Sequence, residues 1–250
     1  LNLLRSRAGV ESFAQVISRN NFPTGAGLAS SASGFAALTA AAAHALDLDL
    51  TPRDLSIIAR QGSGSAARSI FGGFVEMHVG SMADGSDSFA EPVLEAGAWP
   101  LEVVIAITEH GEKAVSSRAG MEQSAASSPY YSEWVASSAH DLACAQQAVL
   151  NKDFETLAGV AEHNCLKMHA AAMAAQPPLI YWNAATVASL HAVRALRASG
   201  VAVFFTIDAG PQLKAVCAPG ASGHVEAVLG AVPGVLDTLV SGLGPGVEAI

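Results

Sequence analysis

Charged residues are scarce in this chain, and clusters of basic residues are scarcer still. Lys, Arg, Asp and Glu make up 14% of the 250 residues, against about 25% in an average soluble domain. Acidic residues outnumber basic ones by 22 to 13, so the net charge is −9 and a nucleic-acid partner is not expected. A surface with so little charge suggests that another subunit covers part of it, and we expect a homodimer.

Cysteines are also few. The three, Cys144, Cys165 and Cys217, show no short paired spacing, which excludes a disulfide scaffold and a Cys-x-x-Cys metal site. All lie among apolar neighbours, so we expect buried free thiols and a cytoplasmic location. No apolar run approaches the ~20 residues that cross a bilayer, so neither a membrane partner nor a leader segment is expected. A His-Glu-x-x-His pattern is absent, and we expect no metal-ligating residues.

The stretch from Asn20 to Ser33 has the pattern of an anion-binding loop. It follows an alternating segment at 13–18 that predicts a strand and precedes an alanine-rich segment at 34–46 that predicts a helix. The first amides of a helix lack intrahelical partners, and glycines let a phosphate approach them. Serine hydroxyls at 30, 31 and 33 can donate to phosphate oxygens. The alternative is a tight turn with a serine N-cap.

This loop does not match the better-known nucleotide motifs. A Walker loop would end in Gly-Lys-Ser or Gly-Lys-Thr, and neither sequence closes this one. A dinucleotide fingerprint would have a third glycine where this chain has Ser30, and no βαβ unit is predicted around it.

A second anion-binding pattern follows a well-marked helix start. Thr51 as N-cap, a proline at the first helical position and Asp54 at the third predict that a helix begins there. The helix ends in Gly-Ser-Gly-Ser at 62–65, which offers amides and hydroxyls to an anion, and Arg68 adds a planar cation. A flexible connection with a solvated arginine is the alternative.

The rest of the chain mixes helices and strands without a strict βαβ repeat, which predicts an α+β fold. Strands are predicted at 74–79, 101–107 and 201–207, and helices at 131–150, 154–175 and 184–199. Residues 80–98 carry glycine, serine, aspartate and proline without periodicity, so we place a loop and a domain boundary there. His110 is a lone histidine in a loop, where solvation is the usual state.

Asp208 directly follows the very apolar segment at 201–207 and precedes the turn-forming residues Ala-Gly-Pro. An aspartate there is well placed for chemistry, and burial would disfavour its charge unless a cation lies near. Lys214 is a nearby cation to which the sequence gives no role. The alternative is an aspartate that caps a following helix.

Several segments, in order along the chain, carry a resemblance to a known family. Pro-Thr-Gly-Ala-Gly-Leu-Ala-Ser-Ser-Ala at 23–32 resembles the nucleotide loop of the GHMP kinases. Within that superfamily, Asn-Asn-Phe-Pro-Thr at 20–24, Gly-Ser-Gly-Ser-Ala-Ala-Arg at 62–68 and Phe-Thr-x-Asp-Ala-Gly-Pro at 205–211 resemble diphosphomevalonate decarboxylases. The resemblance covers essentially the whole chain. It implies a two-lobed GHMP kinase-like fold.

The resemblance implies how the two lobes and the site residues are divided. Residues 1–95 would form a ribosomal protein S5 domain 2-like lobe, incomplete here, and 96–250 a ferredoxin-like lobe that carries the catalytic aspartate. Asp208 would be the base, Arg68 would fix the substrate carboxylate, and Ser63, Gly64, Ser65 and Arg118 would bind substrate phosphates. The nucleotide would be bound by Pro23, Thr24, Gly25, Ala26, Gly27, Leu28, Ala29, Ser30, Ser31, Ser33 and Ser117.

The implied reaction is the ATP-dependent decarboxylation of mevalonate 5-diphosphate to isopentenyl diphosphate, ADP, phosphate and CO₂, with ATP and Mg²⁺ as cofactors. Asp208 would deprotonate the tertiary 3-hydroxyl, which attacks the γ-phosphate, and phosphate and CO₂ then leave. The enzymatic alternatives are a decarboxylase of mevalonate 5-phosphate and a mevalonate 3-kinase-like enzyme. A further alternative is an inactive nucleotide-binding fragment or subunit. The chain starts without Met and reaches the nucleotide loop by residue 23, so an N-terminal truncation is expected.

Overall fold

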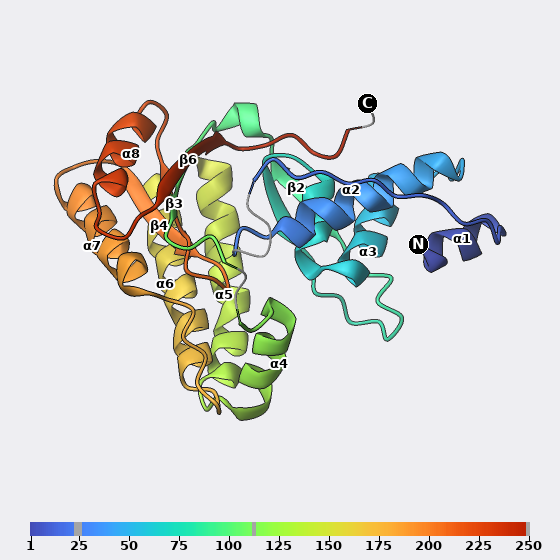
Figure 1. The fold of residues 1–250 in the computed structure, drawn as a ribbon, viewed down its shortest axis with the longest axis horizontal. Coiled ribbons are helices and arrows are strands. Elements are labelled where there is room, and N and C mark those ends of the chain that lie inside the picture. Colours follow the sequence, from blue (N-terminus) through green and yellow to red (C-terminus); the bar gives the residue numbers. More distant parts are fainter. Residues whose placement is uncertain (23–26, 112–113, 249–250) are drawn as a thin grey trace. The chain divides into compact units, whose positions relative to one another are not determined.

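The structure is a computed structural model and describes residues 1–22, 27–111 and 114–248 (Figure 1). The chain divides into two units. Unit 1 consists of Leu1–Thr24, Ala29–Ala98 and Gly244–Ile250, and unit 2 of Gly25–Leu28 and Trp99–Leu243.

The helices of unit 1 are α1 (Asn2–Ala8), α2 (Ser30–Ala45), α3 (Pro52–Gly62) and the 3₁₀ helices η1 (Gly64–Ile70) and η2 (Ala96–Ala98). Its strands are β1 (Phe74–Met77) and β2 (Ala90–Leu94). Unit 2 contains β3 (Glu102–Ile107), α4 (Ser117–Ser127), α5 (Tyr131–Asn151), α6 (Phe154–Met173), α7 (Ala184–Ala198), β4 (Val203–Ile207), β5 (Leu213–Cys217), α8 (Ser222–Gly230) and β6 (Asp237–Gly242).

In unit 1, α2, α3 and η1 pack together through small side chains. Ala36, Ala59, Ala66 and Ile70 form a buried cluster, and small residues of this kind allow the backbones to approach closely. The predicted start of α3 is confirmed, because Thr51 and the third helical residue form a reciprocal capping box. The helix predicted at 34–46 is also confirmed as α2, which begins four residues earlier, at Ser30.

Two predictions for unit 1 are wrong. No strand forms at 13–18, and Phe13 and Ile17 are 92% and 77% exposed. An alternating sequence becomes a strand only where a neighbouring strand accepts its backbone hydrogen bonds, and no such pairing includes this segment in the described residues. The loop predicted at 80–98 contains β2, which pairs antiparallel with β1 although it includes Pro92. A proline is tolerated in β2 because the described sheet has two strands and both are edges.

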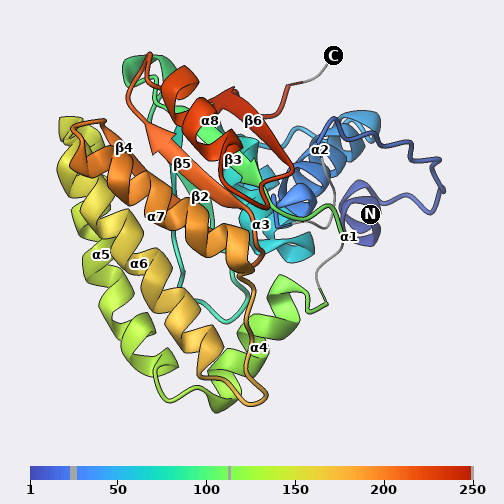
Figure 2. The same ribbon diagram turned by 60° about the vertical axis from the view of Figure 1, so that its left-hand side comes forward.

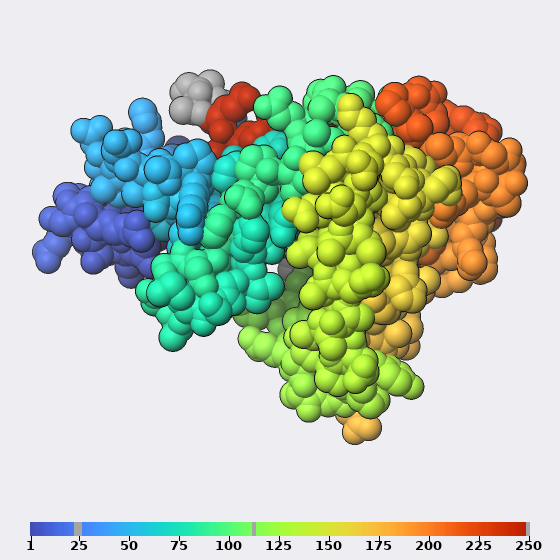
Figure 3. Space-filling view, turned by 180° about the vertical axis from the view of Figure 1, so that it is seen from behind, coloured from blue at the N-terminus to red at the C-terminus, as the bar shows by residue number. Residues whose placement is uncertain are grey.

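Unit 2 is built on an antiparallel sheet of four strands in the order β4-β5-β3-β6. Helix α7 packs on β4 and β5, while α8 packs on β3, β5 and β6 (Figure 2). Helix α6 lies along β4, and α5 packs against α6. From behind, α5 forms a yellow-green ridge on the surface of this unit (Figure 3).

The core of unit 2 lies between its sheet and its helices. Phe205, Ile207 and Leu213, on β4 and β5, are fully buried and pack against Val193 and Leu229 of α7 and α8. The strands predicted at 101–107 and 201–207 are therefore confirmed, as are the helices predicted at 131–150, 154–175 and 184–199. Cys165 and Cys217 are buried as expected, whereas Cys144 is half-buried. No helix in the described part of the chain is both long enough and apolar enough to cross a membrane.

Candidate functional site

In unit 1, the described end of the predicted nucleotide loop is the start of α2. The N-cap residue Ala29 has a left-handed backbone (φ 53°) and makes no side-chain cap. The helix of 16 residues therefore presents the positive end of its dipole without an acceptor from its N-cap side chain. The Ser33 hydroxyl donates to the Ser30 carbonyl at 3.1 Å, within the helix. Four residues of the prediction, Pro23, Thr24, Gly25 and Ala26, lie outside the described residues.

The second predicted segment lies beside the start of α2. The hydroxyl oxygens of Ser31 and Ser63 are 3.1 Å apart, which brings the two glycine- and serine-rich segments together. A Cβ atom added to Gly64 would meet no other atom within 4 Å, so space is open beside this backbone. Ser65 is half-buried, and Arg68 on η1 is exposed. Within the described ranges, no hydrogen bond or ion pair engages the Arg68 guanidinium. These residues could meet an anionic ligand from one side.

In unit 2, Asp208 follows the last residue of β4. Its side chain is 61% exposed, and Lys214 Nζ lies 2.8 Å from its Oδ2 atom. Strand β5 begins five residues later, so the alternative of an aspartate that caps a helix is excluded. The same ammonium group donates to the carbonyl of Gly27 at 2.9 Å. The structure therefore brings Asp208, Lys214 and the buried loop residue Gly27 together; the next loop residue, Leu28, is half-buried.

Three side chains of α6 hold the free edge of β4 just before Asp208. The Phe205 N–H donates to the Glu162 carboxylate at 3.2 Å, and the Ile207 N–H donates to the Cys165 sulfur at 3.3 Å. His169 Nε2 lies 3.1 Å from the Ile207 carbonyl oxygen and donates to it. Edge-strand groups that would otherwise be unpaired are thus satisfied from the helix.

Burial sets the protonation of two of these side chains. It lowers the pKa of His169, against the opposing effects of the Ile207 carbonyl and the Asp208 charge. It also raises the pKa of Cys165 to about 11. The histidine is therefore neutral near pH 7 and the cysteine remains a thiol. Both act as hydrogen-bonding supports of β4 and not as an ionised base or nucleophile.

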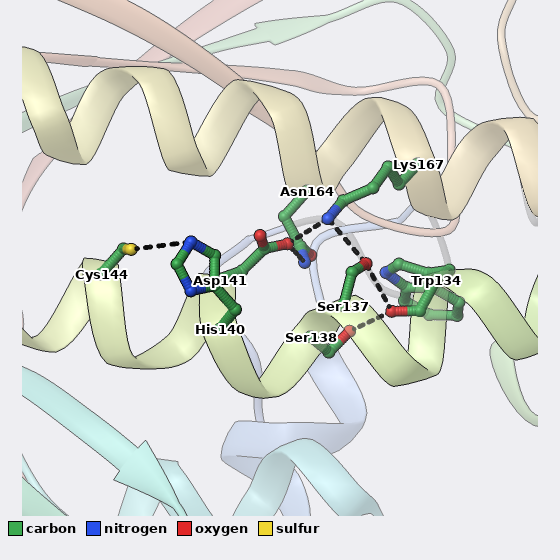
Figure 4. Close-up of polar contacts among 8 residues, drawn as sticks. All are labelled: Trp134, Ser137, Ser138, His140, Asp141, Cys144, Asn164 and Lys167. Carbon is green, nitrogen blue, oxygen red and sulfur yellow. Dashed lines mark hydrogen bonds and ion pairs between the residues drawn. The ribbon is translucent and has the colours of Figure 1, made fainter.

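A polar cluster fixes α6 to α5 (Figure 4). Asp141 on α5 accepts hydrogen bonds from Lys167 Nζ at 2.5 Å and from the Asn164 amide at 2.7 Å, both on α6. The same ammonium group donates to the Ser137 hydroxyl at 2.9 Å. Burial alone would raise the pKa of Asp141, but these hydrogen bonds and the lysine charge outweigh it and hold the pKa below its ordinary value. The ion pair therefore anchors the helix that holds β4.

Ser117 and Arg118 are exposed at the start of α4, where the Ser116 side chain caps the helix. Ser117 and Ala209, the residue after Asp208, line one small apolar pocket of about 20 Å³, which is enough for one water molecule. Its other lining residues are Gly120, Met121, Ser124, Trp134, Met168, His169, Ala172 and Tyr181. The predicted Ser117 thus lies on the same pocket as the Asp208 turn.

Comparison with known proteins identifies the family. The "Diphosphomevalonate decarboxylase-like N-terminal domain" matches residues 1–90. The "Mevalonate 5-diphosphate decarboxylase C-terminal domain" matches residues 103–233. The chain belongs to the diphosphomevalonate decarboxylase family. It is 41% identical to the diphosphomevalonate decarboxylase of Gibberella zeae over 202 residues, which are 79% of this chain and 53% of that protein. The chain thus spans about half the length of the curated relatives it matches.

Solved structures of the family confirm the fold. The mevalonate diphosphate decarboxylase of Staphylococcus aureus matches with a TM-score of 0.92 and 37% identity, over 100% of this chain and 75% of the other. The protein MDDEF, solved with MVAPP, AMPPCP and magnesium, matches with a TM-score of 0.89 and 40% identity, over 99% and 75%. The expected α+β, GHMP kinase-like fold is therefore correct.

Three residues that hydrogen-bond to β4 just before Asp208 are not predicted from the sequence. Glu162, Cys165 and His169 follow the spacing i, i+3, i+7, which places them on one face of a helix. This spacing of polar side chains indicates a helix face that contacts another element. It does not identify that element, because the backbone groups they bind on β4 lie some forty residues further along the chain. The sequence gives Lys214 no role, because its second partner, Gly27, lies 187 residues away in the chain.

Proposed function

We propose that the protein catalyses the ATP-dependent decarboxylation of mevalonate 5-diphosphate to isopentenyl diphosphate, ADP, phosphate and CO₂. Family membership supports the reaction class. The observation that carries the proposal is the exposed carboxylate of Asp208, 2.8 Å from a lysine that also binds the nucleotide loop at Gly27. A carboxylate so placed can receive the proton of a tertiary hydroxyl beside the nucleotide.

ATP and Mg²⁺ fit the residues present. MDDEF was solved with AMPPCP and magnesium, and in this chain the start of α2, without a side-chain N-cap, suits a phosphate. No group of three His, Cys, Asp or Glu side chains that could hold a metal occurs in the described residues. Mg²⁺ does not require one, since it commonly binds through phosphates, waters and one or two carboxylates. When bound, MgATP would supply the phosphoryl group that turns the hydroxyl into a leaving group.

The chain's own residues would divide the remaining tasks. Asp208 would orient the 3-hydroxyl and take its proton. Ser63, Gly64 and Ser65 would hold the substrate diphosphate with Arg118, while Arg68 would fix the carboxylate from which CO₂ departs. Ser117 and the loop from Pro23 to Ser33 would bind the nucleotide. The open space at Gly64 and the exposed guanidinium of Arg68, which has no hydrogen bond or ion pair among the described residues, support these assignments.

We also propose the domain assignment, a nucleotide-binding lobe at 1–95 and a lobe with the catalytic aspartate at 96–250. A homodimer in the cytoplasm is proposed from the low content of charged residues and from the free thiols. Sedimentation equilibrium tests the dimer. A mass of 25.4 kDa at micromolar concentration, that of one chain, would contradict it.

The test of the reaction measures phosphate and CO₂ released from ATP with mevalonate 5-diphosphate, and in parallel with mevalonate 5-phosphate. It uses this chain and a version extended at the N-terminus to the length of the curated relatives. Both products from the diphosphate support the proposal. Products from the monophosphate alone make the protein a phosphomevalonate decarboxylase, and phosphate without CO₂ makes it a kinase. Neither product from either version refutes the enzyme proposal and leaves a nucleotide-binding subunit.

A further inference from the structure

The Lys214 side chain joins two segments that are nearly two hundred residues apart in sequence. Its ammonium group donates to Asp208 Oδ2 at 2.8 Å and to the Gly27 carbonyl at 2.9 Å. Lys214 lies on β5 opposite Thr206 of β4, so its backbone is fixed by the sheet. Its side chain is 12% exposed. The ammonium group is therefore held between two acceptors that belong to the aspartate turn and to the nucleotide loop.

The same two segments also meet through glycines. A Cβ atom added to Gly27 would lie 2.9 Å from the Gly210 Cα atom, so the two backbones are almost in van der Waals contact. Gly27 has a φ of +82°, which favours glycine at this position. The Gly210 N–H donates to the Asp208 carbonyl at 2.7 Å and closes the turn. The loop residue thus rests on the turn that carries Asp208, independently of the lysine.

An ordinary surface ion pair would not explain this arrangement. Exposed pairs contribute little, because water and salt screen them and both side chains keep rotating. Here the carboxylate is exposed but the lysine side chain is only 12% exposed, and its ammonium group also donates to a backbone carbonyl. Its orientation therefore depends on where Gly27 lies, and the orientation of the exposed carboxylate depends on the ammonium.

We propose that Lys214 is a positioning residue that couples the nucleotide loop to Asp208. The inference rests on the proposed function and deepens it. With Gly27 in the observed position, the lysine directs the carboxylate to its catalytic orientation. A shift of Gly27 removes one acceptor of the ammonium and so weakens the constraint that Lys214 places on the aspartate. Proton abstraction by Asp208 is then favoured only when the loop is in place.

The test compares Lys214→Met with Lys214→Arg and with a matched control, Lys152→Met, at an exposed lysine that ends α5. Lys214→Met removes one charge-assisted hydrogen bond to Asp208 and one to the Gly27 carbonyl. It should therefore lower kcat by about tenfold or more and weaken ATP affinity by about tenfold or more. Lys214→Arg should restore a large part of both, and Lys152→Met should change neither. KM for mevalonate 5-diphosphate should stay near the wild-type value, since the lysine binds no substrate atom in this account.

A second background separates the two contacts. In Asp208→Asn, which removes the carboxylate, Lys214→Met should still weaken ATP binding by a similar factor, because the Gly27 contact remains to be lost. Unchanged ATP affinity in both backgrounds would overturn the coupling. So would a loss of kcat that merely follows a loss of folded protein and that Lys214→Arg does not restore.

Failure of the proposed function can be distinguished from failure of this inference. If neither this chain nor its extended version shows turnover with wild-type residues, the proposed reaction is wrong, and the coupling is then decided by ATP affinity and by hydrogen exchange. Peptides that contain Gly27 or Asp208 should exchange about threefold or more faster in Lys214→Met than in Lys152→Met, because the tie between them is lost. Equal exchange in the two variants would refute the coupling even without any activity.

Discussion

The hydrogen bond from His169 to the end of β4 leads to a prediction with a defined pH dependence. His169 is 2% exposed, and its Nε2 atom donates to the Ile207 carbonyl one residue before Asp208. Replacement by leucine keeps the helix and the approximate volume but leaves a buried carbonyl without this donor. That loss should cost about 1–3 kcal/mol in the free energy of unfolding at pH 7.5.

The cost of this replacement should shrink in acid. Burial lowers the pKa of His169 in the folded protein, so below the unfolded value of about 6.5 the unfolded chain binds a proton that the folded protein does not. The stabilisation that comes from neutral His169 is thus complete above this value and is lost as the pH falls toward the lower, folded pKa. At pH 5.5 the wild type should have lost up to about 1.4 kcal/mol that the leucine variant does not lose.

The assay is urea unfolding at both pH values. A matched variant, His191→Leu, changes an exposed histidine on α7 and should leave stability nearly unchanged. His169→Gln, which can still donate to the carbonyl, should recover part of the loss. The reasoning is refuted if His169→Leu costs the same at pH 7.5 and 5.5, or if it costs no more than His191→Leu.

Two further predictions concern the elements that support the site. Lys167→Met leaves the Asp141 carboxylate without its cation, so the midpoint of urea unfolding should fall by the equivalent of about 1–3 kcal/mol; a change no larger than that of Lys152→Met would show that the α5–α6 ion pair does not anchor the helix. Thr51→Ala removes the side chain that accepts from the Asp54 amide and caps α3, and should lower the stability of unit 1 by about 1 kcal/mol. Thermal unfolding with an unchanged midpoint would contradict the capping role.

Much of the fold could be predicted because its signals are local. The Thr51 capping box, the alanine-rich helix after the nucleotide loop and the apolar strand before Asp208 all depend on neighbouring residues. The two wrong predictions both concern whether a segment pairs with a neighbouring strand. The alternating segment at 13–18 has no neighbouring strand in the described residues, and β2 with its Pro92 forms only because β1 lies beside it. Strand formation depends on partners that are not local in sequence.

For the candidate site, too, the residue types on the loops can be predicted locally, whereas the contacts between distant segments cannot. The loop residues proposed for the site are predicted from their types and order. The structure places the Ser31 hydroxyl beside that of Ser63, and Ser117 and Ala209 line one pocket. What the sequence could not provide is the support from a distance: His169 at the edge of β4, and Lys214 between the aspartate and Gly27. These contacts depend on tertiary packing.

The central claim is that Asp208 is the base of an ATP-dependent decarboxylation. Its most direct test is the release of CO₂ and phosphate by Asp208→Asn, in a version of the protein that turns over, with ATP affinity measured on the same sample. Loss of the base should lower turnover by at least about 100-fold, while ATP affinity stays within about threefold, because the carboxylate is not assigned to the nucleotide. Turnover at the wild-type rate would contradict the claim, and so would a loss explained entirely by lost ATP binding.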